Sequence, residues 1–180
     1  MRTAYADPPY LGLAQSTYGH LHPDAADYDR LETHAALIAG MDARFDAWAM
    51  SLHAPSLKQI LSVCPDDVRI CPWVKPFASF KPNVNPGFTW EPVIFRGCRG
   101  GRSLTERTIR DYVSAPIALK RGFCGAKPEA FCWWVFDMLG IGPNDEFTDL
   151  FPGSGAVTRA WDVYRVGHAG RPLFAGLESP

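Results

Sequence analysis

The feature that most constrains the fold of this chain is the alternation of short strand-like runs with helix-like segments along its 180 residues. Parallel strands need a crossover connection, and a helix usually supplies it. This alternation therefore predicts an α/β fold in which a doubly wound, mostly parallel sheet is covered by helices on both faces. The length fits a single domain spanning residues 1–180, and no apolar run reaches the roughly 20 residues of a membrane span.

Periodicity and turn residues locate the expected elements. Strands are expected at residues 3–6, 45–52, 68–74, 89–95, 147–151 and 173–178. Helices are expected at residues 24–40, 55–63, 104–113, 128–139 and 155–164. Asp24 is a suitable N-cap for the first of these helices, and Pro55 and Pro128 suit the first turns of two others.

The first strand-like run ends in Asp7-Pro8-Pro9-Tyr10. Two prolines stiffen a turn, so the Asp7 carboxylate and the Pro8 carbonyl can be held on one side as hydrogen-bond acceptors. Two acceptors aimed at the hydrogens of an amine on an aromatic ring would favour sp³ geometry and free the nitrogen lone pair for attack, while Tyr10 stacks on the ring. We therefore predict that Asp7, Pro8, Pro9 and Tyr10 are catalytic. A rigid structural turn is the alternative interpretation.

Near the other end, a second strand-like run leads into Asp149-Leu150-Phe151-Pro152-Gly153-Ser154-Gly155. Glycines let the backbone approach a ligand and adopt positive φ, and doubly wound sheets bind ligands where such a turn enters a helix. Glu178 lies 23 residues beyond Gly155, a spacing that suits a carboxylate binding a ribose diol. No Gly-x-x-x-x-Gly-Lys pattern is present, so a phosphate-free adenosine ligand fits better than NAD or ATP. An ordinary strand–turn–helix junction is the alternative.

Basic residues concentrate in the middle of the chain. Residues 69–121 contain ten Lys or Arg and three Asp or Glu, although the net charge of the whole chain is −1. Such a basic stretch is typical of a surface that binds a polyanion. The predicted nucleic-acid contacts are Lys75, Lys81, Arg96, Arg99 and Arg102. A solvated basic surface is the alternative.

Together the two motifs resemble those of S-adenosylmethionine-dependent DNA amino-methyltransferases that modify adenine at N6. In that family Asp-Pro-Pro-Tyr is the catalytic motif and Phe-x-Gly-x-Gly is the cofactor motif. The order found here, with the catalytic motif first, resembles the circularly permuted beta class. Lys127-Pro128 resembles the element that precedes the cofactor strand, residues 90–95 resemble a strand common in the family, and residues 170–178 resemble the segment that delivers the ribose-binding acid.

The resemblance implies a Rossmann-like methyltransferase fold, S-adenosylmethionine as cofactor, and methyl transfer to N6 of adenine in DNA. It places the following residues at the cofactor: Asp149, Phe151, Gly153, Ser154, Gly155, Glu178 and Lys127. The alternatives are a methyltransferase acting on RNA or on a small aromatic amine, and a catalytically idle nucleic-acid-binding module. Intact Asp7 and an intact glycine turn count against the idle module, because it needs neither.

The chain also departs from the family pattern. It stops soon after Glu178, so we expect a truncated fold without the helix and strand that usually contact the cofactor's adenine ring. Residues 97–125 are the candidate for a short target-recognition insertion. With so short an insertion, either sequence specificity is modest or the second subunit of a homodimer completes the DNA surface.

Cysteine and histidine usage indicates neither disulfides nor a metal site. The five cysteines are odd in number and form no Cys-x-x-Cys pair, which favours reduced thiols in a cytoplasmic protein. His20 and His22 have no third ligand at a suitable spacing, so no metal is expected.

Overall fold

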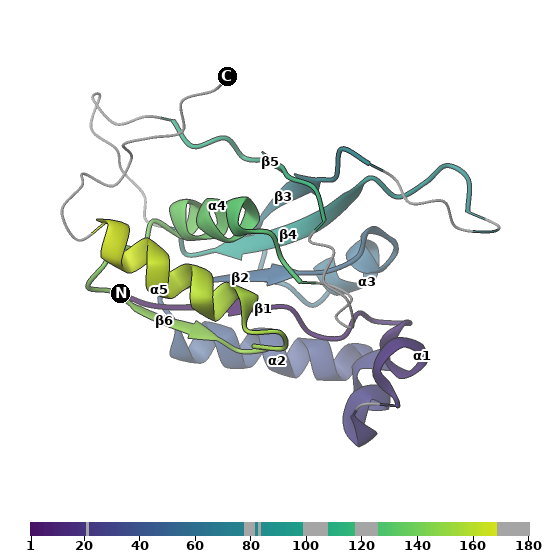
Figure 1. Cartoon of the computed structure of the whole chain (residues 1–180). Helices are drawn as coiled ribbons and strands as arrows, with labels where there is room; N and C mark the ends of the chain where they lie inside the picture. The colour runs from purple at the N-terminus through teal and green to yellow at the C-terminus, as the bar shows by residue number, and fades with distance from the viewer. Residues whose placement is uncertain (21, 78–81, 83, 99–107, 118–125, 169–180) are drawn as a thin grey trace.

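The computed structural model describes residues 1–20, 22–77, 82, 84–98, 108–117 and 126–168 (Figure 1). Within them a six-stranded sheet has the order β5-β3-β4-β2-β1-β6. The strands are β1 (Arg2–Ala6), β2 (Ala47–Ser51), β3 (Arg69–Val74), β4 (Trp90–Arg96), β5 (Val113–Ser114) and β6 (Glu146–Asp149). The α-helices are α1 (Ala14–Tyr18), α2 (Leu31–Arg44), α3 (Leu57–Leu61), α4 (Glu129–Leu139) and α5 (Ala156–His168). Two 3₁₀ turns, η1 (Pro23–Asp29) and η2 (Ala54–Ser56), precede α2 and α3.

The sheet is mostly parallel. Strand β1 pairs in parallel with β2 on one side and β6 on the other, and β3 pairs in parallel with β5. Strand β4 runs antiparallel to both of its neighbours, β2 and β3. Five strands therefore point one way and β4 points the other, which confirms the expected mostly parallel sheet.

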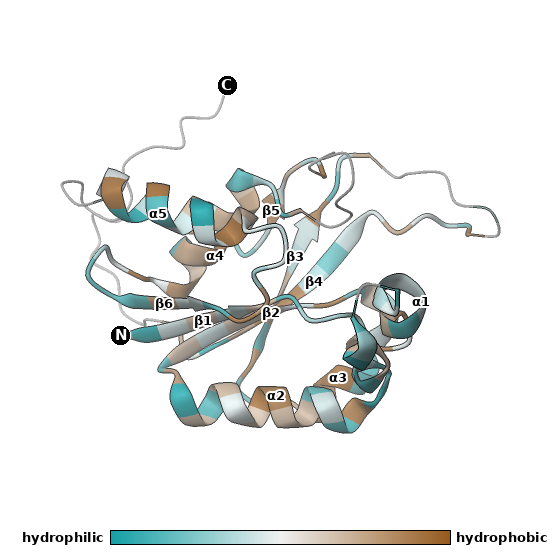
Figure 2. Ribbon diagram, turned by 60° about the horizontal axis from the view of Figure 1, so that its bottom comes forward, coloured by the Kyte–Doolittle hydropathy of each residue, from teal (hydrophilic) through white to brown (hydrophobic). Residues whose placement is uncertain are grey.

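Helices cover both faces of this sheet, with α4 and α5 on one side and α2 and α3 on the other (Figures 1 and 2). Side chains of β1 alternate between the two layers, as the pleat of a strand requires. Ala4 and Ala6 belong to the core that includes Ile38 of α2, whereas Tyr5 belongs to the core that includes Phe131 of α4. The doubly wound arrangement expected from the sequence is confirmed.

Helix α4 brings an aromatic-rich segment onto the sheet. Its buried residues are Phe131, Cys132, Trp134, Val135, Phe136 and Leu139. Phe136 meets both Trp161 and Tyr164 of α5 edge-on, with ring centroids 5.5 and 5.1 Å apart. The helix ends at Gly140, which has the left-handed conformation that glycine adopts without steric cost. This packing fixes the start of α4, and with it Lys127, against the carboxyl ends of the strands.

The helix expected at residues 24–40 is wrong at its start. Pro23 opens a 3₁₀ turn instead, Arg30 is extended, and the α-helix begins at Leu31. The reason is tertiary: the Asp29 carboxylate accepts hydrogen bonds from the backbone amides of Ala14 and Gln15, each at 2.9 Å, and so caps the short helix α1. Helix α1 was not expected from the sequence.

The helix expected at residues 104–113 is wrong over residues 108–113, the part that the structure describes. Residues 108–112 are irregular, and Val113 begins the short strand β5, which pairs with Trp73 of β3. A long-range pairing with β3 outweighs the local helical pattern here. The strand expected at residues 173–178 lies outside the described residues. The other expected strands and helices are confirmed with boundary shifts of a few residues.

Candidate active site

The two sequence motifs meet at one edge of the sheet. Tyr5 of β1 is in register with Asp149 of β6, and the Leu150 amide donates to the Tyr5 carbonyl oxygen at 2.9 Å. Asp7 and Asp149 therefore follow or end neighbouring parallel strands, which lie roughly 5 Å apart. Burial raises the pKa of Asp149 and the charge of Asp7 raises it further, although a hydrogen bond from Thr158 opposes both. The adjacency expected from the sequence is present.

The Asp7 carboxylate is anchored through one of its two oxygens. Lys127 Nζ lies 2.9 Å from Asp7 Oδ1, and the Tyr10 hydroxyl lies within hydrogen-bond distance of the same oxygen, at 3.2 Å. The Asp7 side chain retains 23% exposure. Within the described residues both contacts fall on Oδ1, which leaves Oδ2 to accept a hydrogen bond from a substrate.

Lys127 is the most buried member of this cluster, with 5% of its side chain exposed. Its ammonium lies 5.5 Å from the ring centre of Trp73 and 3.8 Å from Glu91 Oε2. Burial lowers the pKa of Lys127, but the carboxylates of Asp7 and Glu91 outweigh it and raise the pKa above its ordinary value. Family resemblance assigned Lys127 to the cofactor, and in this structure its ammonium contacts Asp7 of the catalytic motif.

Glu91 of β4 is the functional candidate that sequence reasoning missed. Its Oε2 lies 3.1 Å from the Tyr10 hydroxyl, and its Oε1 accepts a hydrogen bond from Lys75 Nζ. Burial raises the pKa of Glu91, but the charges and hydrogen bonds of Lys127 and Lys75 hold it below its ordinary value. The available signal was a single acid within the otherwise apolar start of this strand, Trp90-Glu91-Pro92-Val93.

Tyr10 is held from two directions. Besides its hydroxyl contacts, its ring stacks on His53, with ring centroids 5.5 Å apart and planes 6° from parallel. His53 Nδ1 lies 2.9 Å from Ser56 Oγ at the 3₁₀ turn before α3. The sequence predicted that Tyr10 stacks on a target ring, and His53 occupies one face of Tyr10 in this structure.

The glycine turn is tied to the helix that follows it. Gly153 and Gly155 have φ of 43° and 70°, and α5 begins immediately afterwards. A Cβ atom on Gly155 would lie 2.8 Å from Arg159 Nη1, which donates to the Ser154 carbonyl oxygen at 3.0 Å. This backbone conformation favours glycine and leaves the turn bare of side chains at both positions.

Two other predicted cofactor residues lie around this turn. Asp149 Oδ2 accepts a hydrogen bond from Thr158 Oγ1 at 3.0 Å, which links the end of β6 to α5. Phe151 lies edge-on to Tyr28, with centroids 5.7 Å apart. Glu178 lies outside the described residues. Asp149, Phe151, Gly153, Ser154 and Gly155 thus gather at one turn.

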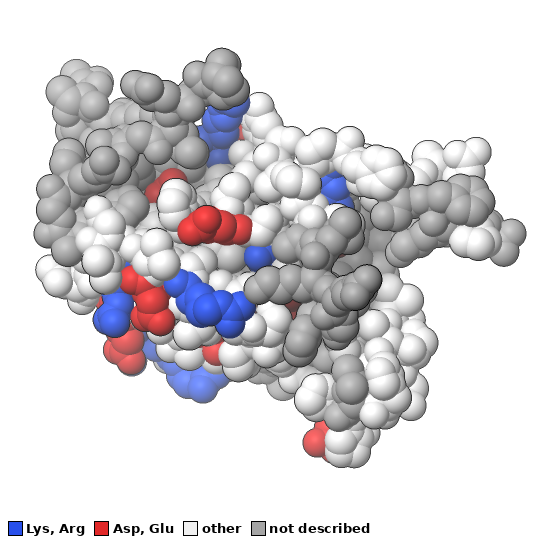
Figure 3. Space-filling model, viewed as in Figure 1, with Lys and Arg blue, Asp and Glu red and all other residues white. Residues whose placement is uncertain are grey.

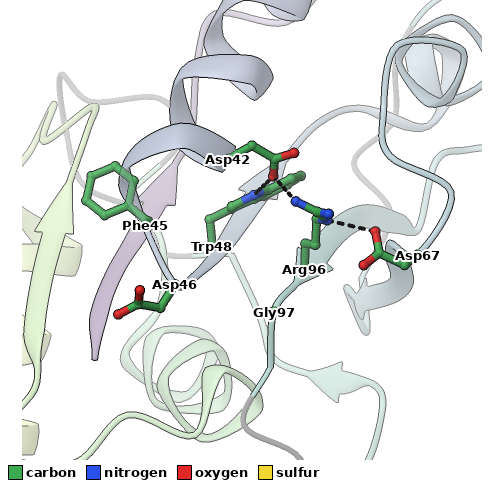
Figure 4. A pocket seen from close by; sticks show the side chains of 7 residues that line it. All are labelled: Asp42, Phe45, Asp46, Trp48, Asp67, Arg96 and Gly97. Carbon is green, nitrogen blue, oxygen red and sulfur yellow. Dashed lines mark hydrogen bonds and ion pairs between the residues drawn. The ribbon is translucent and has the colours of Figure 1, made fainter.

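Of the predicted nucleic-acid contacts, the structure describes Lys75 and Arg96. Lys75 is engaged by Glu91 within the cluster at Asp7. Arg96 lies near the opposite edge of the sheet, in register with Trp48 at the start of β2, where it pairs with Asp42 at 2.5 Å and Asp67 at 2.7 Å (Figure 4). Arg96 is therefore not brought together with Asp7.

The remaining predicted contacts, Lys81, Arg99 and Arg102, lie outside the described residues. On the face shown in Figure 3, the basic and acidic side chains that are drawn intermix and form no continuous basic field. Within the described part of the chain, no cluster of three or more His, Cys, Asp or Glu could hold a metal ion. No helix in that part has the length and apolar character needed to cross a membrane.

No protein-family model matches the chain, and no curated protein matches its sequence. Several solved structures resemble its fold, and two of them are of M1.HpyAVI. The crystal structure of the M1.HpyAVI–SAM complex matches with a TM-score of 0.58 at 15% identity, over 90% of this chain and 77% of that one. The crystal structure of M1.HpyAVI matches with a TM-score of 0.55 at 13% identity, over 91% and 75%. With the sheet order and the two helical layers, this similarity establishes a Rossmann-like α/β fold of the kind found in M1.HpyAVI.

Proposed function

We propose that this protein transfers a methyl group from S-adenosylmethionine to the exocyclic N6 amine of adenine in DNA. One observation carries the proposal: Asp7 and the glycine turn after Asp149 lie at the carboxyl ends of adjacent parallel strands. In doubly wound folds this is the edge where ligands bind. An amine held by Asp7 and a methyl donor held at the turn would therefore meet side by side.

The turn after β6 has the features that the cofactor requires. The residues that would hold S-adenosylmethionine are Asp149, Phe151, Gly153, Ser154 and Gly155, with Glu178 proposed for the ribose. Positive φ at both glycines keeps the backbone accessible to an adenosine group. The similarity to the fold of M1.HpyAVI, which was crystallised with SAM, supports this assignment. When bound, the cofactor supplies a methyl group already activated by its sulfonium.

Asp7 has the geometry of an acceptor for the target amine. With Oδ1 engaged by Lys127 and Tyr10, Oδ2 can accept one hydrogen of the amine, and the Pro8 carbonyl can accept the other. The new N–C bond forms as the S–C bond breaks, and Asp7 takes the proton that the nitrogen releases. Holding the amine at near-attack distance is the main contribution of the protein.

A target base in double-stranded DNA must leave the base stack before it can reach this edge of the sheet. Adenine in a duplex is inaccessible, so it would flip out at a cost of a few kcal/mol or be supplied on a single strand. If the base stacks on the face of Tyr10 that His53 now occupies, His53 must swing away first. Pro9 completes the stiff turn that presents Tyr10.

The choice of DNA as substrate rests on the basic composition of residues 69–121 and on the motif pattern of the chain. Lys81, Arg99 and Arg102 remain the proposed phosphate contacts, and residues 97–125 remain the proposed target-recognition insertion. A homodimer in which a second subunit completes the DNA surface belongs to the same proposal.

A small aromatic amine is the second candidate substrate, and the ion pairs of the basic segment favour it. Arg69 pairs with Asp111, Lys75 with Glu91, and Arg96 with Asp42 and Asp67. Charges already neutralised within the protein release fewer counterions on binding a polyanion. Such a substrate would use the same Asp7 geometry.

The proposal is tested by replacing Asp7 and following transfer of an isotope-labelled methyl group from S-adenosylmethionine to DNA. Asp7→Ala should lower turnover by roughly 10²–10³-fold, because acceptor and positioning are both lost. Its affinity for S-adenosylmethionine, measured by calorimetry, should stay within several-fold. Asp7→Asn, which keeps the side-chain shape and one acceptor oxygen, shows whether the loss reflects the missing charge rather than misfolding.

Asp24→Ala is the matched control, since Asp24 is exposed on the 3₁₀ turn η1, and it should transfer methyl groups at the wild-type rate. Near-normal turnover in Asp7→Ala would show that Asp7 is only a turn residue. Wild-type protein that neither binds S-adenosylmethionine nor transfers its methyl group would refute the proposed function as a whole.

A further inference from the structure

A buried polar network connects Asp7 to strands β3 and β4 and to the segment before α4. Lys127 contacts Asp7 at 2.9 Å and Glu91 at 3.8 Å, and Lys75 contacts the far oxygen of Glu91. The Tyr10 hydroxyl stands between the two carboxylates, 3.2 Å from Asp7 Oδ1 and 3.1 Å from Glu91 Oε2. The network therefore joins residues that lie 84 positions apart in the sequence, from Asp7 to Glu91.

The network is electrically balanced. Two carboxylates, Asp7 and Glu91, face two ammonium groups, Lys75 and Lys127, and the side-chain exposures lie between 5% and 23%. Charges at this depth interact far more strongly than charges in water, so the loss of any one member leaves a poorly compensated charge. The raised pKa of Lys127 and the lowered pKa of Glu91 agree with mutual stabilisation of the charged forms.

The Tyr10 hydroxyl has two competing hydrogen-bond acceptors. A phenol has one proton, so the Tyr10 hydroxyl can donate to Asp7 or to Glu91 but not to both at once. Lys127 Nζ also lies 3.3 Å from the Tyr10 oxygen and can donate to it while holding Asp7 Oδ1. Lys127 thus secures Asp7 whichever carboxylate receives the tyrosine proton.

We propose that Glu91 and Lys127 are positioning residues for the methyl transfer, which fix Oδ1 of Asp7 and balance its charge so that Oδ2 stays an ionised acceptor for the target amine. This inference rests on the proposed function and assigns both residues a role that they exert through Asp7. Lys75 supports them by holding Glu91 from the other side.

The proposal predicts opposite effects of two substitutions on the pH dependence of turnover. Lys127→Met removes a positive charge beside the Asp7 carboxylate, so the acid limb of the kcat profile moves to higher pH. Glu91→Gln removes a negative charge from the same network, so the acid limb moves to lower pH. The shift in Lys127→Met should amount to about one pH unit or more, because Lys127 Nζ lies 2.9 Å from Asp7 Oδ1. The shift in Glu91→Gln should be smaller, because Glu91 reaches Asp7 through Tyr10 and Lys127.

The other ionisable groups around Asp7 do not change this sign. Those that face it are Tyr5, Tyr10, Lys127, Glu91 and Asp149, and Tyr18 faces Lys127. Burial, aided by the Asp7 charge, raises the pKa of Tyr5 and of Tyr10 well above the ordinary value, so neither tyrosine ionises in the acid range. Asp149 is unaltered in both variants.

The experiment measures kcat and KM from acid to neutral pH for wild type, Glu91→Gln, Lys127→Met and Lys127→Arg. In Glu91→Gln and Lys127→Met, kcat should fall about tenfold or more, and KM for S-adenosylmethionine should stay within several-fold. Lys127→Arg keeps the positive charge and should return the acid limb to its wild-type position. Matched controls are Glu32→Gln and Lys58→Met, two exposed residues, which should leave the profile unchanged.

A second measurement makes the test independent of turnover. The carboxyl carbon of Asp7 can be titrated by ¹³C NMR, assigned by its loss in Asp7→Asn, and should shift in opposite directions in Glu91→Gln and Lys127→Met. The positioning role would be overturned if the acid limb of the kcat profile and the Asp7 titration curve did not move in Glu91→Gln and Lys127→Met, or moved in the same direction in both. Opposite titration shifts in a protein that transfers no methyl group would uphold the charge network and refute the proposed function instead.

Discussion

At the scale of single residues, a charged side chain can be buried at this site because oppositely charged groups lie beside it. Lys127 remains charged with 5% of its side chain exposed because Asp7 and Glu91 both face it. Removing one partner of such a pair costs roughly 3–5 kcal/mol, since an unpaired buried charge remains. At the turn after β6 the requirement is conformational instead, since Gly153 and Gly155 both have positive φ.

Gly155→Ala should weaken the binding of S-adenosylmethionine. Alanine at positive φ costs roughly 1–2 kcal/mol, and its Cβ would press on Arg159 Nη1, which holds the Ser154 carbonyl. Gly12→Ala is the control, because Gly12 has φ of 82° but nothing within 4 Å of the added Cβ. Calorimetry with S-adenosylmethionine and thermal unfolding would be measured on both variants. Equal affinities in the two would contradict the assignment of this turn to the cofactor.

At the scale of elements, the sequence predicted those strands and helices whose formation depends on the apolar pattern within the segment itself. Strands β1, β2 and β4 and helix α4 follow the apolar patterns closely. The adjacency of Asp7 and Asp149 was also predictable, because parallel strands share their carboxyl edge. In contrast, the capping of α1 by Asp29 and the pairing of Val113 with Trp73 depend on contacts between segments that the sequence does not reveal.

The residues of the candidate site also fall into two groups, those recognisable in the sequence and those brought together only by the fold. The motif residues were recognisable because short spacing places them on one turn, as at Asp7 and Tyr10 or at Gly153 and Gly155. The partners of Asp7 were not, because Glu91 and Lys127 reach it from β4 and from the segment before α4. Family resemblance assigned Lys127 to the cofactor, which stays a prediction, and gave no indication of its contact with Asp7.

The bridge between β4 and the start of α4 should make the stability of the fold depend on pH. Because the folded pKa of Glu91 lies below its ordinary value of 4.5, its contribution is fully present above that pH and is lost as pH falls through the folded pKa. Lys127, whose pKa is raised, keeps its contribution throughout this acid range. Glu91→Gln should therefore lower the free energy of unfolding by about 3 kcal/mol near neutral pH, and by less in acid.

Denaturant unfolding of wild type and Glu91→Gln between pH 7 and pH 3 measures this difference directly. The gap between the two proteins should narrow only below about pH 4.5, the ordinary value for Glu91. Glu32→Gln, at a side chain 78% exposed, should track wild type at every pH. A gap that stays constant down to pH 3 would mean that Glu91 contributes packing rather than charge.

At the scale of the whole molecule, the first strand and the last described strand of the chain lie side by side in one sheet. Strand β1 opens the chain, and β6 begins 144 residues after β1 begins, yet the two strands are neighbours in parallel register, with Glu146 opposite Arg2. Helices on both faces bury the sheet and leave the carboxyl edge for Asp7 and the glycine turn (Figure 1). The basic residues of the middle segment that the structure describes are largely paired, so the substrate must be identified chemically.

The most direct measurement is the identity of the methylated product. The protein would be incubated with isotope-labelled S-adenosylmethionine and, separately, with DNA, RNA and small aromatic amines, and the nucleic acids digested to nucleosides for mass analysis. We predict labelled N6-methyladenine from DNA with wild type, and a roughly 10²–10³-fold smaller amount with Asp7→Ala. Label on another base, or on RNA or a small amine with none on DNA, would contradict the proposed substrate.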